Sequence, residues 1–176
     1  MQLPRDFIYH QSLKKNGVVY MDVIHFTMEY SEEQDAQILG VYINGENLNE
    51  LMRRYEIQFE PSIAGGYEGL NIEYLKDIEE HFFGKLNEND IYNYDGKTLV
   101  LGCNCGEPGC WPLIVRITEE DEVIIWSEFE QPFRDEESAG GYWDYTNFKS
   151  LEFNKQLYEE QLKAICKKFR EVGNST

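Results

Sequence analysis

The stretch 17–30 is rich in β-branched and aromatic residues, and apolar residues follow one face of it at the two-residue period of a β-strand. The opposite face of this stretch is apolar as well, so we expect a central strand that is covered on both sides. The apolar positions of the first face are Val18, Tyr20, Ile24, Phe26 and Met28.

A second apolar stretch, 36–45, ends in Asn44-Gly45, a dipeptide typical of tight hairpin turns. Five polar residues, 31–35, connect it to the first stretch. The two are therefore expected to pair as a hairpin.

A block of three further strands is expected in the second half of the chain, at 97–103, 111–118 and 123–130. The last two flank the acidic turn 119–122 and form the clearest hairpin in the sequence. Pro112 cannot donate a ladder hydrogen bond, so it should stand at the start of its strand.

Three stretches have helical periodicity, at 47–56, 70–82 and 154–172. Asn47 and Asn154 are the first residues of the first and last of these stretches, and asparagine is a favoured N-cap residue. In the middle stretch the apolar residues at helical spacing are Leu70, Tyr74, Leu75, Ile78 and Phe82.

The order of these elements predicts an α+β fold with a mostly antiparallel sheet and two or three helices, including the amphipathic C-terminal helix. We find no repeat or linker, so residues 1–176 are expected to form a single domain. The stretch 131–148 is expected to be irregular, and loops of this length are often functional.

The chain carries 33 acidic and 16 basic residues, a formal net charge of −17. This charge argues against binding to nucleic acids or anionic membranes, which requires clustered Lys and Arg. It suits either solubility or a basic protein partner. No apolar run approaches the roughly 20 residues that span a bilayer, and the N-terminus lacks a signal-peptide pattern, so a cytoplasmic protein is expected.

Three of the four cysteines stand within the stretch 101–113: Cys103, Cys105 and Cys110. Zinc usually takes four thiolate or imidazole ligands, and the usual knuckle has C-x2-C spacing. C-x-C on an extended chain sends the two side chains to opposite faces, although the neighbouring glycines can bend the backbone. The alternatives are a metal site and a crowded turn in which the thiols only pack.

A metal site at these cysteines needs a fourth ligand from elsewhere in the chain. The candidates are Cys166, His81, His10, His25 or a carboxylate. A disulfide or a redox motif is not favoured, because the compartment is reducing and C-x-x-C is absent. No catalytic triad, phosphate loop or metal-binding helix motif is found, so no catalytic residue is assigned. These absences favour a non-enzymatic role and leave a metal-dependent enzyme open.

Aromatic residues gather in the C-terminal half, where most are expected to build the core. Tyr142, Trp143 and Tyr145, however, lie in the irregular stretch downstream of Arg134. Trp, Tyr and Arg are enriched at interface hot spots. The residues considered for a binding surface are Trp111, Trp126, Gln131, Arg134, Tyr142, Trp143 and Tyr145.

Four segments of the chain form a distinctive set: "INGENLNELMRRYE" and "AGGYEGL" in the first half, and "LGCNCGEPGCWPLIVRI" and "VIIWSEFEQPFR" in the second. On these segments the chain resembles a family of uncharacterised bacterial proteins. Phe133 stands where many relatives have His, which removes a ligating side chain there. The resemblance implies a self-contained fold and brings no activity; the positions that it marks are Cys103, Cys105, Cys110, Trp111, Trp126, Gln131 and Arg134.

Two functional hypotheses follow. The first is a non-enzymatic acidic module, immunity-like or regulatory, that binds a basic protein and uses no cofactor. The second is a zinc-binding protein or metal-dependent enzyme that uses Cys103, Cys105 and Cys110.

Overall fold

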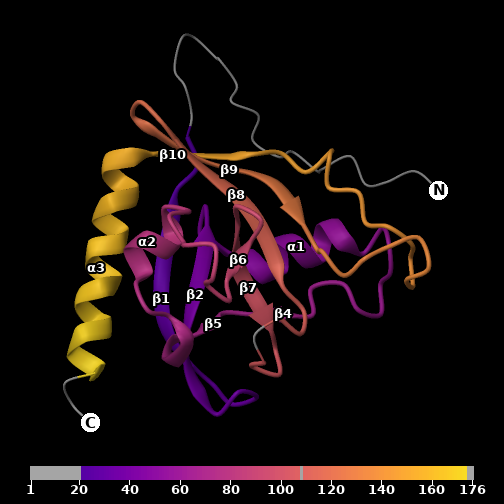
Figure 1. Ribbon diagram of the computed structural model, residues 1–176, viewed down its shortest axis with the longest axis horizontal. Helices are drawn as coiled ribbons and strands as arrows, with labels where there is room; N and C mark the ends of the chain where they lie inside the picture. The colour runs from indigo at the N-terminus through magenta and orange to yellow at the C-terminus, as the bar shows by residue number, and fades with distance from the viewer. Residues whose placement is uncertain (1–20, 108, 174–176) are drawn as a thin grey trace.

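The computed structural model describes residues 21–107 and 109–173. Over these residues the chain has the α+β fold that the sequence predicts, with antiparallel strands and three α-helices including the C-terminal one (Figure 1). The strands divide into two sheets, which the sequence does not predict. The first 20 residues lie outside the described part, and with them the start of the strand expected at 17–30 and the histidine at position 10.

The first sheet contains the N-terminal hairpin. β1 (Ile24–Ser31) pairs along its whole length with β2 (Ala36–Ile43), and β2 also pairs with the short strands β3 (Glu46–Asn47) and β5 (Leu70–Asn71). Asn44 and Gly45 both have positive φ, 53° and 84°, as a two-residue hairpin turn between β2 and β3 requires.

The second sheet follows the order β10-β9-β8-β7-β4, with β6 also paired to β7. The hairpin expected around the acidic turn is confirmed as β8 and β9. The bounds of these strands are β4 (Tyr67–Glu68), β6 (Asn93–Tyr94), β7 (Lys97–Cys103), β8 (Leu113–Glu120), β9 (Val123–Glu130) and β10 (Leu151–Asn154).

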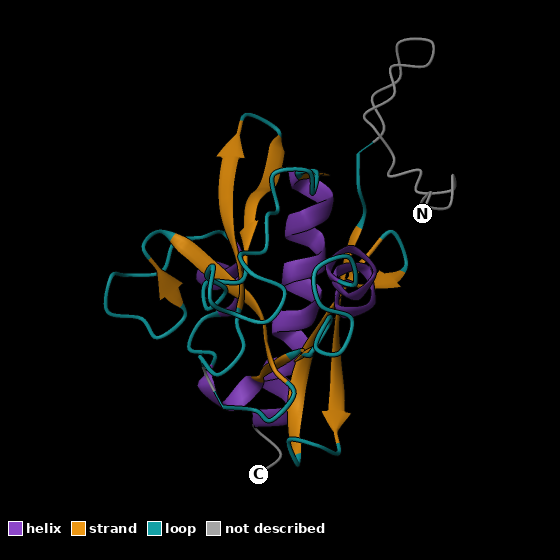
Figure 2. Ribbon diagram, turned by 90° about the vertical axis from the view of Figure 1, so that its right-hand side faces the viewer, coloured by secondary structure: helices purple, strands orange, loops and turns teal. Residues whose placement is uncertain are grey.

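The helices α1 (Leu48–Glu56) and α3 (Lys155–Gly173) begin where the sequence predicts. The Asn47 side chain accepts from the Asn49 backbone N–H at 2.8 Å, and the Asn154 side chain accepts from the Leu157 N–H at 3.1 Å. Each therefore satisfies an N–H of the first turn that lacks an intrahelical partner. Helix α3 runs alongside β1 at one end of the molecule (Figures 1 and 2).

Two expectations are wrong. The stretch 70–82 is not one helix: it contains β5, a 3-10 turn (Ile72–Tyr74) and the short α2 (Ile78–Phe82). Asn71 caps the 3-10 turn and Asp77 caps α2, and each cap starts a new element. β1 is not a central strand either, because it stands at the end of its sheet and pairs with β2 alone among the named strands.

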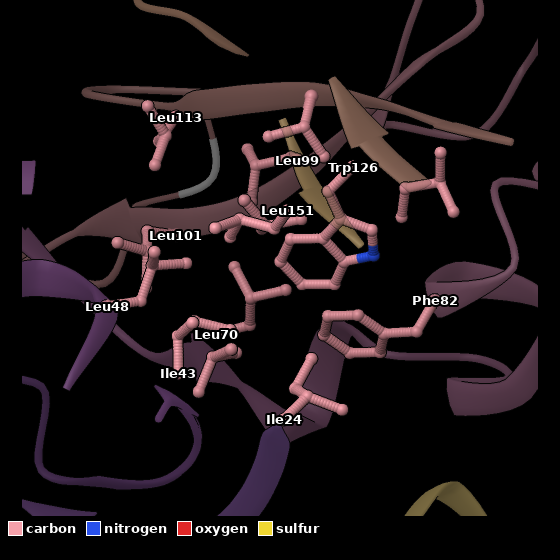
Figure 3. Close-up of a cluster of buried hydrophobic side chains, with 14 of the residues drawn as sticks. Ile24, Ile43, Leu48, Leu70, Phe82, Leu99, Leu101, Leu113, Trp126 and Leu151 are labelled. Atoms are coloured by element: carbon pink, nitrogen blue, oxygen red, sulfur yellow. The ribbon is translucent and has the colours of Figure 1, made fainter. Parts of the chain in front are cut away.

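One hydrophobic core joins both sheets and the helices. Trp126 of β9 is fully buried and stacks on Phe82 of α2, with ring centroids 6.0 Å apart (Figure 3). The Trp126 Nε1–H donates to the Tyr158 hydroxyl at 3.1 Å, and that hydroxyl donates to the Phe82 carbonyl at 2.6 Å. Every polar atom of this contact therefore has a partner inside the core.

Candidate metal site

The three clustered cysteines meet where β7 ends. Cys103 is the last residue of β7, and Cys105 and Cys110 lie in the connection to β8. Their Sγ atoms all lie within 4.8 Å of one another. Cys103 is buried, whereas Cys105 and Cys110 are exposed, so the cluster opens to the surface on one side.

The backbone turn after Cys103 brings the thiols together. The Gly106 N–H donates to the Cys103 carbonyl at 3.0 Å, and the Cys110 N–H donates to the Glu107 carbonyl at 3.2 Å. Gly106 and Gly109 both have φ of +80°, a conformation that favours glycine. Because the extended backbone stops at Cys103, the two side chains of the C-x-C pair do not diverge as they would along a strand.

The thiols differ in their electrostatic surroundings. Burial, together with hydrogen bonding to the neighbouring thiols, raises the pKa of the Cys103 thiol. Hydrogen bonds from the Cys103 side chain and from the Glu107 backbone lower the pKa of Cys105. The Cys105 N–H also donates to the Cys103 Sγ at 3.5 Å, an interaction that favours the thiolate which a metal needs.

The end of β7 is fixed from the side by β4 and by the β1–β2 turn. Tyr67 stands opposite Cys103 in the β4–β7 ladder. The Gln34 Nε2 donates to the Cys103 carbonyl at 3.4 Å and to Oε2 of Glu68 at 3.1 Å. Two segments that are far from β7 in the sequence, β4 and the β1–β2 turn, thus hold the first cysteine in place.

No fourth His, Cys, Asp or Glu joins the cluster within the described residues. The His81 Nε2 lies 2.7 Å from the Leu99 carbonyl in the core, and the His25 Nδ1 lies 2.7 Å from the Gln161 side chain. Cys166 is buried on α3. Position 10 lies outside the described part of the chain.

Trp111, the residue after Cys110, is one of two tryptophan rings that pack against the guanidinium of Arg134. The Arg134 Cζ lies 4.7 Å from the ring centroid of Trp111 and 5.4 Å from that of Trp143. The backbone carbonyl of the buried Gln131 accepts from the Arg134 N–H at 3.2 Å. The structure therefore brings together Trp111, Gln131, Arg134 and Trp143, four of the residues considered for binding.

The seven residues considered for a binding surface differ widely in exposure. Trp126, Gln131, Trp143 and Tyr145 are buried, and Trp111 and Arg134 are half-buried. Tyr142 is 58% exposed. Most of these residues therefore pack inside the protein. Trp143, for example, stacks on Phe59, with 5.7 Å between the ring centroids.

A buried carboxylate that the sequence does not single out lies against two buried tyrosines, Tyr67 and Tyr145. Glu56, at the end of α1, has no exposed surface and accepts hydrogen bonds from Tyr67 at 2.7 Å, Tyr145 at 2.6 Å and the Gly65 N–H at 2.9 Å. Burial raises the pKa of its carboxyl, and the three hydrogen bonds oppose that rise. In the sequence, Glu56 is only one of many acids on helices, so nothing marks it.

Comparison of the chain with protein-family models, with curated proteins and with solved structures finds no match. The resemblance to a bacterial family stays a prediction. Among the described residues, no helix is both long enough and apolar enough to cross a membrane.

Proposed function

We propose that this protein binds a zinc ion through the thiolates of Cys103, Cys105 and Cys110. The observation that supports the proposal is the convergence of the three Sγ atoms to within 4.8 Å of one another. Thiolates on a tetrahedral zinc, with Zn–S bonds of about 2.3 Å, stand roughly 3.8 Å apart. Contraction of the cluster by about 1 Å brings the sulfur atoms to that spacing.

The chemistry of the donors selects the metal. Thiolates are soft ligands, which favour zinc, copper(I) and iron–sulfur clusters over magnesium or calcium. Among these, a single zinc ion needs no more than the three converging sulfurs and one further ligand. In this role the ion fixes the connection between β7 and β8, where Cys105 and Cys110 are exposed.

The proposal is tested by elemental analysis of protein purified without a metal-affinity tag. We expect one zinc ion per chain, lost in Cys105→Ser. Cys166→Ser is the matched control, since Cys166 is a buried thiol on α3, apart from the cluster, and this variant should keep its zinc. Wild-type protein that stays free of metal after incubation with zinc under reducing conditions would contradict the proposal.

A second candidate function is the binding of a basic protein, immunity-like or regulatory. It is supported by the net charge of −17 and by Phe133 and Tyr142, which are 48% and 58% exposed on the same irregular segment. The test is capture from lysate at low and high salt. We expect the wild type to capture a partner in a salt-sensitive way, and the Phe133→Ser, Tyr142→Ser double variant to lose this capture. Tyr30→Ser is the control and should keep it. Equal capture by the wild type and both variants would contradict this second function.

A further inference from the structure

We infer that the metal site has an exchangeable fourth position that takes the sulfur of a small neutral or cationic thiol. This inference rests on the proposed zinc site and adds the class of ligand that the site accepts. It depends on the number of protein ligands, on the exposure of the cluster and on its charge.

The described part of the chain supplies three ligands and no fourth. Structural zinc sites are closed by four protein ligands, whereas sites with three keep one position for solvent or substrate. Cys105 and Cys110 are exposed, and Cys103 forms the buried floor of the cluster. The fourth position therefore faces the solvent and is open to small molecules.

The charge of the site decides what that position does. A zinc ion with three thiolates carries a net charge of −1, so little of its positive charge remains to acidify a bound water. A hydroxide nucleophile is thus not favoured. A soft metal centre prefers a sulfur donor, so an incoming thiol displaces the water, forms a Zn–S bond and releases its proton to the solvent.

The charge of the whole protein adds a preference among thiols. A net charge of −17 repels an anionic ligand and attracts a cationic one. Glu107, which is exposed two residues after Cys105, adds to this field locally. We expect cysteamine to bind more tightly than 2-mercaptoethanol, and 2-mercaptoethanol more tightly than mercaptoacetate.

The test uses the full chain loaded with cobalt(II) in place of zinc, under anaerobic conditions. The d–d and sulfur-to-cobalt charge-transfer bands report the number of sulfur ligands while each of the three thiols is titrated. Before any thiol is added, we expect X-ray absorption to show three sulfurs and one oxygen. Each titration should then saturate with a fourth sulfur, the cobalt staying on the protein.

Salt separates the electrostatic preference from the intrinsic basicity of the three thiols. Raising the salt to about 1 M, where the Debye length is about 3 Å, should reduce the affinity ratio of cysteamine to mercaptoacetate at least about twofold. An affinity ratio that does not change with salt would overturn the charge preference. Cys166→Ser should titrate as the wild type does, because its three-cysteine cluster is intact.

Failure of the inference is distinguishable from failure of the zinc proposal. A chain that takes up no cobalt overturns both. Three results overturn the open position alone. The first is cobalt with four sulfur ligands before any thiol is added. The second is a nitrogen ligand that is lost in a His10→Ala variant, and the third is a set of bands that no thiol changes. Loss of the cobalt into the filtrate on addition of thiol also overturns it.

Discussion

The Tyr145 hydroxyl donates a 2.6 Å hydrogen bond to Oε1 of Glu56, 89 residues earlier in the chain. This contact ties the irregular segment 131–148 to the end of α1, and Tyr67 of β4 donates to the same oxygen at 2.7 Å. Since Tyr67 stands opposite Cys103 in the β4–β7 ladder, the network is connected to the end of the strand that carries the first cysteine of the cluster. The candidate site therefore has a buried polar support that is separate from its sulfur ligands.

Tyr145→Phe should lower the free energy of unfolding by about 1–3 kcal/mol, because it removes one donor from a buried carboxylate. The measurement is urea denaturation followed by far-UV circular dichroism. Tyr142→Phe is the control, since Tyr142 is exposed on the same segment and should stay within about 0.5 kcal/mol of the wild type. Equal stabilities for the two variants would contradict the proposed role of the network.

Glu56→Gln should change how stability depends on pH. Burial raises the pKa of Glu56 in the folded protein, so the folded state holds this proton more tightly than the unfolded state does. The resulting stabilisation is complete below the unfolded pKa of about 4.3 and is lost as the pH rises through the higher folded pKa. Relative to wild type, Glu56→Gln should therefore gain stability as the pH rises through this window.

The measurement for Glu56 is the difference in free energy of unfolding between variant and wild type at a series of pH values. Glu50→Gln is the matched control, because Glu50 lies exposed on the same helix and its removal changes the net charge equally. We expect no comparable pH dependence for the control. A Glu56→Gln difference that stays flat with pH would rule out a raised pKa.

Gly106→Ala should weaken zinc binding about tenfold or more, because Gly106 has φ of +80° in the turn that brings the cysteines together. A Cβ there would also lie 3.2 Å from the Gln34 side chain. Competition with a chromophoric zinc chelator measures the change. Gly45→Ala has the same unfavourable φ, 84°, with nothing within 4 Å of the added Cβ, and should leave zinc affinity unchanged.

Tyr158→Phe should destabilise the fold by about 1–3 kcal/mol without affecting zinc binding. Its hydroxyl accepts from Trp126 and donates to the Phe82 carbonyl, so the variant leaves two buried polar groups unpaired. Thermal unfolding followed by tryptophan fluorescence measures the loss. A variant as stable as the wild type would show that this part of the core tolerates unpaired groups.

Much of the fold follows from local pattern. The acidic turn between two apolar stretches predicts β8 and β9, and Asn154 predicts the start of α3, because each signal is contained in a few neighbouring residues. The prediction of one helix at 70–82 is wrong because the apolar spacing is only one of the signals in this stretch. Its apolar spacing is helical, but Asn71 and Asp77 each cap a separate short element, and β5 is held by pairing with β2.

The candidate site is harder to predict because its geometry depends on where a strand ends. C-x-C spacing alone allows the thiols either to diverge or to converge, and the turn after Cys103 decides between the two. The aromatic segment shows the same limit. Trp143 and Tyr145 are buried by Phe59 and Glu56, partners more than 80 residues away that local pattern does not reveal.

Zinc K-edge X-ray absorption tests the central claim most directly, applied to full-length protein purified without a metal-affinity tag. The account predicts one zinc per chain with three sulfur neighbours at about 2.3 Å, a zinc ion that is lost in Cys110→Ser as in Cys105→Ser and unchanged in Cys166→Ser. Zinc bound only by oxygen and nitrogen, or three free thiols and no metal in protein incubated with zinc, would contradict it.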